Sequence, residues 1–344
     1  MGVAEFFVSY VQRFLPTFAI RLLVRFYLKT FVGWRLRGGD VVVKQIEFDR
    51  RQRNQKPVTI DADVTNEQLY ANDPEFFRTH LGPKLKYSSC EWPDRNTTLP
   101  EAEIYTIARY QDMLGLPNGS RVLELGCGWG SLSLSNAERF PHLNFVAFSN
   151  STPQIEFIRS QAEERGLSNL TVFVEDYALF VNPETSQVAP IESPLFDAAV
   201  AIETVEHAQN ISELLAAVAL RLRPDAKFFV QSLLHQSASY LLDNDSWMGR
   251  NFFTGGSIIA LNSYFHLAPA DLYLADVIPV NGGEYSKTLL SWLSLQEQNR
   301  RKLVAKYGSE FYEGFRMFYI SCAEAFAANN GAEYMCGYYT FVKR

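Results

Sequence analysis

Two carboxyl groups and an imidazole follow directly after an apolar run at residues 196–202, as Glu203, Glu206 and His207. The run predicts a β-strand, and spacings of three and four residues in a helix after it can bring the three side chains to one side. A carboxylate and an imidazole can accept a proton, and a second carboxylate can hold a cation. The alternative is a solvated acidic helix start that complements the helix dipole.

A glycine-rich turn is the strongest local indication of a ligand site. The apolar run 121–125 leads straight into Gly126, Gly128 and Gly130, and a helix is predicted from Ser131. Glycines allow a tight turn and close approach of a ligand to the backbone, and the helix start offers free N–H groups. The spacing G-x-G-x-G differs from the G-x-G-x-x-G of pyrophosphate-binding turns, so it indicates another nucleotide-like ligand.

Together with Glu124, the turn resembles motif I of the S-adenosylmethionine-dependent methyltransferases. The resemblance implies S-adenosylmethionine as the cofactor and requires no metal. That superfamily usually places an acid after the second strand for the ribose hydroxyls, but here uncharged Asn150 and Gln154 follow that strand. Asp176, after the third strand, has a position suited to the adenine amino group. The predicted cofactor-binding residues are Tyr87, Ser88, Gly126, Gly128, Gly130, Asn150, Gln154, Asp176 and Tyr177.

Further segments narrow the resemblance to one family. The matching segments are residues 87–90, 126–131, 203–207, 247–256 and 321–324. From about Asp63 to its C-terminus, the chain resembles the cyclopropane-fatty-acid synthase and coclaurine N-methyltransferase family.

The two branches of this family differ in chemistry. In the cyclopropane branch, the resemblance implies, the methyl goes to an alkene carbon and a bound bicarbonate takes the proton. That site uses a cysteine where Ser89 stands, with residues matching Glu206, His235 and Tyr285. The position of Glu203 is not acidic in that branch, whereas the alkaloid N-methyltransferases have Glu-x-x-Glu-His there. Ser89 and Glu203 together therefore favour an amine substrate over an alkene.

We therefore expect an enzyme that moves the methyl of S-adenosylmethionine to the nitrogen of a small, aromatic, tetrahydroisoquinoline-like amine. Glu206 and His207 are the predicted general-base pair, and Glu203 is the predicted anchor for the substrate ammonium. Two alternatives stay open: a lipid-modifying methyl or methylene transferase acting on unsaturated acyl chains, and a binding protein that keeps the cofactor without catalysis. The predicted substrate contacts, alternatively core residues, are His235, Tyr285, Phe252 and Trp247.

The composition is typical of a folded enzyme. The chain has 344 residues, 47% hydrophobic and 20% charged, so it can bury a substantial core. Its net charge of −6 lacks the basic field that draws a protein onto nucleic acid, so no nucleic-acid partner is expected. The four cysteines stand singly without metal-ligand spacing, which favours reduced thiols and a cytoplasmic protein. The oligomeric state is open, and a homodimer is compatible with the sequence.

Apolar runs alternate with helical stretches from about residue 121. This pattern predicts an α/β fold, a Rossmann-like class I methyltransferase sheet that is mainly parallel with an antiparallel last strand. We expect residues 1–110 to form a helical N-terminal extension and residues 111–344 the methyltransferase domain, with a helical insertion at about 240–316 covering the site. The predicted strands are 121–125, 144–148, 170–174, 196–202, 227–232 and 333–342, and the predicted helices are 131–140, 153–166 and 211–222.

The segment 6–34 is amphipathic. Basic residues interrupt it, so no apolar stretch reaches the roughly 18 residues that a membrane-spanning helix needs. Its apolar residues recur at helical spacing, at Phe14, Phe18, Leu22 and Phe26. The pattern predicts a helix that docks on the protein or lies in a membrane interface, so peripheral membrane contact is an open alternative.

Overall fold

The computed structural model describes the chain except for residues 1–11, 33–40, 57, 60–72, 191–192 and 243–245. The strands are β1 (Arg121–Leu125), β2 (Asn144–Ser149), β3 (Leu170–Val174), β4 (Phe196–Ile202), β5 (Leu222–His235), β6 (Tyr240–Leu241), β7 (Ser257–Ala260), β8 (Leu272–Val280) and β9 (Tyr334–Lys343). The helices are η2 (Gln12–Phe14), α2 (Thr17–Tyr27), η3 (Leu28–Val32), α4 (Val41–Asn54), α6 (Pro74–Arg78), α7 (Leu99–Leu114), α8 (Ser131–Arg139), α9 (Thr152–Glu164), α10 (Tyr177–Phe180), η5 (Val205–His207), α11 (Ile211–Arg221), α12 (Trp247–Asn251), α13 (Ser263–Leu267), α14 (Gly282–Gln298), α15 (Arg300–Tyr307) and α16 (Ser309–Gly331).

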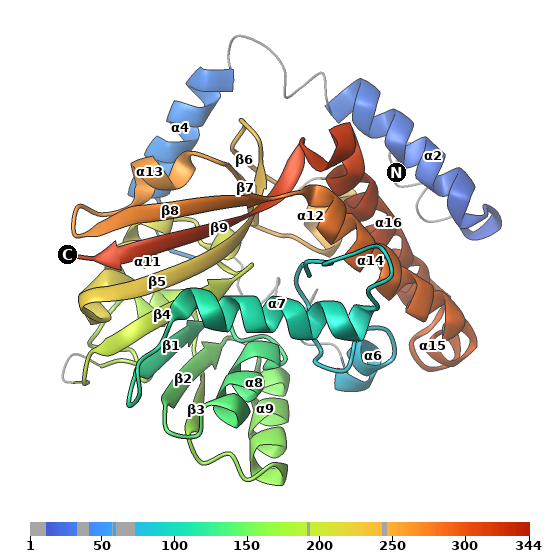
Figure 1. Ribbon diagram of the computed structural model, residues 1–344. Coiled ribbons are helices and arrows are strands. Elements are labelled where there is room, and N and C mark those ends of the chain that lie inside the picture. Colours follow the sequence, from blue (N-terminus) through green and yellow to red (C-terminus); the bar gives the residue numbers. More distant parts are fainter. Residues whose placement is uncertain (1–11, 33–40, 57, 60–72, 191–192, 243–245) are drawn as a thin grey trace.

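A single mixed sheet organises the fold (Figure 1). Strands β3, β2, β1, β4 and β5 pair side by side and parallel. β9 then pairs antiparallel with β5, and β8 pairs antiparallel with β9. The prediction of a mainly parallel sheet with an antiparallel last strand is confirmed.

The segment 240–316 departs from the expectation that it is helical. It contributes β6, β7 and β8 as well as helices, and β8 lies outside β9 at the sheet edge. Pro279 is tolerated in β8 because an edge strand leaves one side of its backbone without a ladder partner. The pairing partner of β8 follows far along the chain, so the local pattern gave little indication of this strand.

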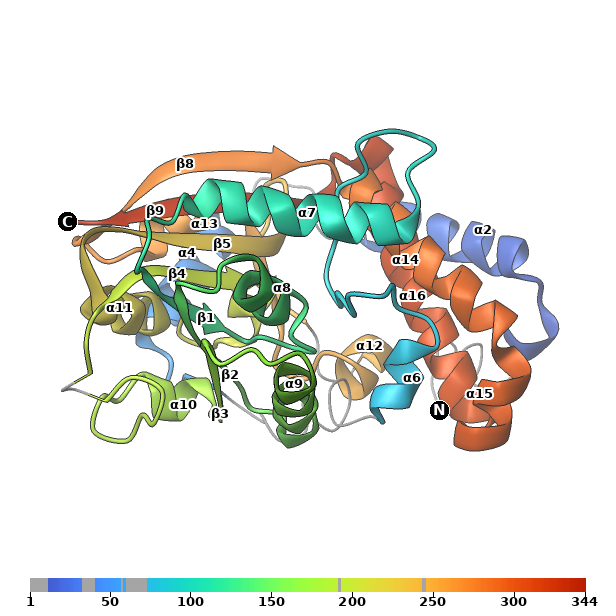
Figure 2. The same cartoon turned by 60° about the horizontal axis from the view of Figure 1, so that its bottom comes forward.

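The two faces of the sheet bury different apolar residues. Val122 of β1 and Val200 of β4 belong to a core shared with α7, α14 and α16. Their neighbours Leu123 and Ala201 belong to a second core, shared with α11 and α13. This alternation is what successive residues of a strand buried on both faces produce. Figure 2 shows α7 crossing the first of these faces.

Helix α2 docks on α16 by its basic side rather than by the predicted apolar stripe. Arg21 and Arg25 bind the carboxylate of Glu324, and Ile20 is fully buried. The apolar stripe of α2 faces solvent instead. In the part of the chain that the structure describes, no helix is long and apolar enough to span a membrane.

Candidate functional site

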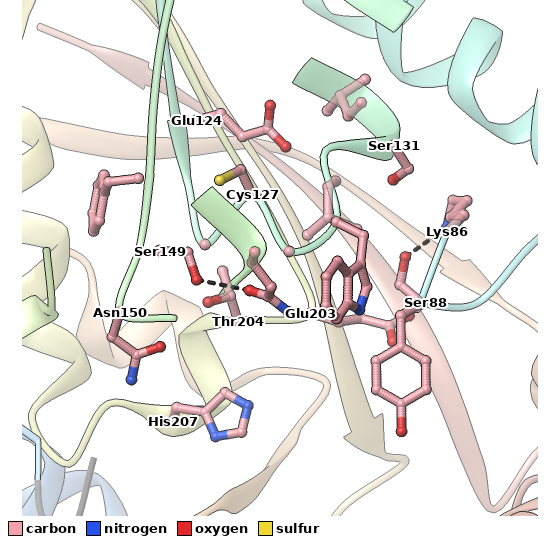
Figure 3. Close-up of a pocket in the computed structure, with 18 of the residues that line it drawn as sticks. Lys86, Ser88, Glu124, Cys127, Ser131, Ser149, Asn150, Glu203, Thr204 and His207 are labelled. Atoms are coloured by element: carbon pink, nitrogen blue, oxygen red, sulfur yellow. Dashed lines mark hydrogen bonds between the residues drawn. The ribbon is translucent and has the colours of Figure 1, made fainter. Parts of the chain in front are cut away.

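A pocket opens where β1, β2 and β4 end, and Figure 3 shows the side chains that converge there. Ligands of open parallel sheets bind at this carboxyl edge because the loops after neighbouring strands meet there. The wall includes Lys86, Tyr87, Ser88, Glu124, Gly126, Cys127, Gly128, Trp129, Asn150, Gln154, Glu175, Asp176, Tyr177, Glu203, Thr204, His207 and Thr254. Eight of the nine predicted cofactor-binding residues are therefore brought together. The exception is Gly130, which packs toward Ile158 behind the turn.

The glycine turn is shaped both by its own packing and by the pocket. Gly126 has φ +64°, and a Cβ there would lie 2.1 Å from Oγ1 of Thr204. Gly128 has φ +53°, and a Cβ there would meet no protein atom within 4 Å. The first glycine is thus required by the neighbouring chain, whereas the second leaves the backbone accessible to a ligand.

Two buried donors in the pocket wall fit a bound cofactor. Nε1 of Trp129 and Nε2 of Gln154 are buried and have no hydrogen-bond partner among the described residues. Oε1 of Gln154 accepts from the hydroxyl of Ser149 at 2.8 Å, which leaves the amide nitrogen as the available donor. Since buried polar groups are normally satisfied, both donors call for acceptors on a ligand.

The acid that ends β1 is also buried in the wall. Oε2 of Glu124 accepts from the hydroxyl of Ser133 at 2.6 Å. Burial raises the pKa of Glu124 to about 7, because the charged form loses hydration. Glu124 and Glu175 line the pocket although neither was in the predicted site, and motif I itself could have indicated Glu124.

Asp176 and Tyr177, which follow β3, also line the pocket. Oδ1 of Asp176 accepts from the backbone N–H of Leu179 at 2.8 Å and so caps α10. The hydroxyl of Tyr177 lies 2.6 Å from Oγ1 of Thr204. These hydrogen bonds hold both side chains at the edge of the pocket.

Lys86 is a further pocket residue that was absent from the predicted site. It is 1% exposed, and its ammonium group donates to Oγ of Ser88 at 2.7 Å. The buried carboxylate of Glu103 on α7 accepts from the backbone N–H of Lys84 and Lys86 and so fixes this loop. A lysine directly before the matched segment 87–90, between apolar residues, was the available sequence signal.

Glu203 stands at the end of β4 in a left-handed backbone conformation, with φ +50°. Its Oε1 accepts from the backbone N–H of Ser89 at 2.9 Å and from the side-chain amide of Gln231. Burial raises the pKa of Glu203, while the positive charge of Lys86 opposes that rise. The result is an acid in the pocket wall with donors already arranged around one oxygen.

The other two members of the predicted triad diverge. His207 lines the pocket, and burial lowers its pKa to about 4, so the imidazole is neutral near pH 7. Glu206 is not among the described residues that line the pocket. The expected common side therefore holds for Glu203 and His207 only. The three residues do not have the spacing of a regular α-helix. Glu203 has a positive φ outside any helix, and Glu206 and His207 lie in η5, a 3₁₀ turn of only three residues.

Glu206 is instead buried beside the backbone of β5. Its Oε1 accepts from the backbone N–H of Leu233, and its Oε2 has no hydrogen-bond partner among the described residues. Burial, followed by the nearby Glu203, raises the pKa of Glu206 to about 8. The carboxyl is thus mostly protonated at pH 7.

None of the four predicted substrate contacts is among the described residues of the pocket wall. Nδ1 of His235 accepts from the backbone N–H of Ala238 at 3.0 Å, and Nε2 lies 3.3 Å from Oε1 of Glu333. The other three pack against aromatic rings. The ring centroids lie 4.7 Å apart for Tyr285 and Phe326, 4.5 Å for Phe252 and Phe318, and 5.3 Å for Trp247 and Phe252. Over the described residues, no cluster of three or more His, Cys, Asp or Glu side chains could hold a metal ion.

Comparison with known proteins places this geometry in a family. Residues 59–334 match the family described as Mycolic acid cyclopropane synthetase. (S)-coclaurine N-methyltransferase of Thalictrum flavum subsp. glaucum is 26% identical over 345 residues, covering 96% of this chain and 92% of that protein. Cyclopropane-fatty-acyl-phospholipid synthase of Escherichia coli (strain K12) is 24% identical over 274 residues, covering 78% and 65%.

A solved structure has the same fold over its whole length. The crystal structure of coclaurine N-methyltransferase bound to N-methylheliamine and SAH superposes with a TM-score of 0.88 at 24% identity, covering 99% of both chains. The family match and the glycine turn indicate S-adenosylmethionine as the cofactor. The two buried donors without protein partners fit a ligand bound in the same pocket. The chain belongs to the mycolic acid cyclopropane synthetase family of S-adenosylmethionine-dependent methyltransferases, on the side of the coclaurine N-methyltransferases.

Proposed function

We propose that this protein transfers the methyl group of S-adenosylmethionine to the nitrogen of a small amine of the tetrahydroisoquinoline type. The observation that carries the proposal is the carboxyl group of Glu203 in the pocket wall, with a lone oxygen of a second buried acid, Glu206, near it. An amine needs an anion to hold its cationic form and an acceptor for the proton that it loses. The similarity to an (S)-coclaurine N-methyltransferase supports the same substrate class.

When bound, S-adenosylmethionine supplies an electrophilic methyl on a sulfonium centre. Trp129, Gln154, Asn150 and Asp176 are the residues that would hold it, since they line the pocket. We assign the glycine turn the role of letting the cofactor approach the backbone. The enzyme then has to align the amine nitrogen with the methyl, which is the main source of acceleration in a displacement.

Binding of the ammonium group and acceptance of its proton are assigned to different side chains. Glu203, in its ionised form, anchors the substrate ammonium. We assign proton acceptance to Glu206 and His207 together. With its pKa raised to about 8, Glu206 in its ionised form is a stronger base than an ordinary carboxylate, and the ionised fraction that can accept a proton grows as the pH rises toward 8. The neutral His207 in the wall is positioned to relay that proton or to hydrogen-bond the amine.

The test is a radiolabelled methyl-transfer assay with two acceptor sets in parallel: tetrahydroisoquinoline and phenethyl amines, and liposomes of unsaturated phospholipid. The proposal expects label in the amine pool, increasing with pH as amine and base lose protons. Label confined to the lipid would overturn it.

A lipid-modifying methyl or methylene transferase is the second candidate. The observations that favour it are the family match to cyclopropane synthetases and the exposed apolar side of α2. Against it stands Glu203, because the alkene substrate itself is neutral and gives this acid no ammonium group to anchor. The same two-acceptor assay separates the candidates.

A further inference from the structure

Helix α2 and the 3₁₀ turn η2 before it expose an apolar stripe, defined here as Phe14, Phe18, Leu22 and Phe26. These side chains are 87%, 68%, 58% and 64% exposed, respectively. Leu23 and Tyr27 beside them are 46% and 53% exposed. Contiguous large apolar side chains at such exposure usually mark an interaction surface.

The fold itself sets this orientation. The opposite side of α2 is held by Ile20, which is fully buried, and by two arginines on one carboxylate. That carboxylate belongs to Glu324, whose side chain is completely buried. Thr17 adds a hydrogen bond of 2.6 Å to Glu297. Rotating the apolar stripe inward would break both ion pairs, so its exposure is not the result of a loosely attached helix.

The charge around the stripe indicates what covers it. Residues 6–39 contain six basic residues and no acidic one, whereas the chain as a whole carries −6, so all other residues together carry −12. Arg13 and Lys29 are exposed at the two ends of the stripe. A second copy of the chain on a two-fold axis would bring two such cationic segments together, which is unfavourable. An anionic lipid surface accepts both the phenylalanines and the basic residues.

We propose that α2 docks the enzyme on anionic membrane surfaces, with the apolar stripe in the lipid interface and the exposed Arg13 and Lys29 at the head groups. This docking does not depend on which acceptor is methylated. It concerns the location of the enzyme and stands apart from the chemistry of the pocket.

The test is co-sedimentation of the full-length protein with vesicles of phosphatidylglycerol and phosphatidylcholine, and with vesicles of phosphatidylcholine alone. The variant Phe14→Ser, Phe18→Ser, Phe26→Ser removes three aromatic side chains of the stripe. The matched control, Ile104→Ser, Leu220→Ser, Phe265→Ser, removes side chains that are 56%, 62% and 63% exposed elsewhere. We expect the stripe variant to bind the anionic vesicles at least about tenfold more weakly, and the control to bind like the parent.

Three results would overturn the proposal. These are no vesicle binding by the parent, equal binding by parent and stripe variant, or a parent dimer that the stripe variant alone dissociates without any vesicle binding. Circular dichroism of both triple variants checks that the fold is kept. Because vesicle binding is measured without substrate, a failure here leaves the proposed amine methylation untouched.

Discussion

The backbone N–H of Ser89 donates a hydrogen bond of 2.9 Å to Oε1 of Glu203, across 114 positions of sequence. Both are positions at which the resemblance implies a difference from the cyclopropane branch, and the fold places them in contact. The carboxylate of Glu203 therefore accepts a hydrogen bond from the backbone of Ser89, the position where the resemblance implies a cysteine of the bicarbonate site in the cyclopropane branch.

Glu203→Gln should lower kcat by about 100-fold, because a neutral amide cannot hold the substrate cation. The affinity for S-adenosylmethionine, measured by calorimetry, should stay within about threefold of the parent, since a single anchor of the amine is removed. Glu203→Gly suits the φ of +50° and opens a space. Recovery of its activity by added formate would support the role, and parent-like kcat in Glu203→Gln would contradict it.

Lys86→Met should move the acidic limb of the kcat/KM profile to higher pH. The ammonium of Lys86 opposes the burial that raises the pKa of Glu203, so its loss lets that pKa rise further. Glu203 then becomes ionised only at higher pH. Lys86→Arg keeps the charge and should restore the position of the limb. An equal fall in rate at every pH, in both variants, would mean a structural role alone.

Trp129→Phe should weaken the binding of S-adenosylmethionine by about tenfold, since it removes a donor that the protein leaves unsatisfied. Trp292→Phe is the matched control. Its Nε1 is likewise buried without a partner among the described residues, yet it lies outside the pocket wall. Calorimetry should give parent-like affinity for the control. Equal weakening in both variants would remove Trp129 from the cofactor site.

Glu206→Gln should make thermal stability less sensitive to alkaline pH. Burial raises the pKa of Glu206 to about 8 in the folded protein, from an ordinary value of 4.5. Protonation therefore favours the folded state: the contribution is complete below pH 4.5 and is lost as pH rises through 8. The free energy of unfolding of the parent should fall relative to the variant between pH 5 and 9, on the order of 3 kcal/mol.

Denaturant unfolding at those two pH values measures this difference. The control is Glu310→Gln, on an exposed side chain, which should track the parent at both pH values. A difference between parent and Glu206→Gln that is the same at pH 5 and pH 9 would contradict the assigned burial effect.

The sequence was informative wherever structure is set locally. The runs that became β1, β3 and β4 have the predicted bounds, because short apolar stretches between turn residues can bury both faces in a parallel sheet. The glycine turn specified the pocket for the same reason. Its glycines have positive φ, a conformation that the residue type itself indicates, even though Thr204 and Ile158 also pack against two of them.

The features that were missed depend on distant contacts. Lys86 is placed by Glu103 on another element, and β8 is placed by β9. The orientation of α2 is fixed by Glu324, 303 positions away from Arg21. Helical periodicity identified an amphipathic helix correctly but could not show that its basic side faces inward, because that depends on one buried acid.

Because of the ion pairs of Glu324, the folding stability of the protein depends on its N-terminal helix α2. Its carboxylate has no exposed surface, and Arg21 and Arg25 are the cations that neutralise it. Deleting α2 would leave a bare charge on α16, the helix that packs against α14 beside the methyltransferase sheet. A shortened protein should therefore lose folding stability through its C-terminal half, far along the sequence from the cut.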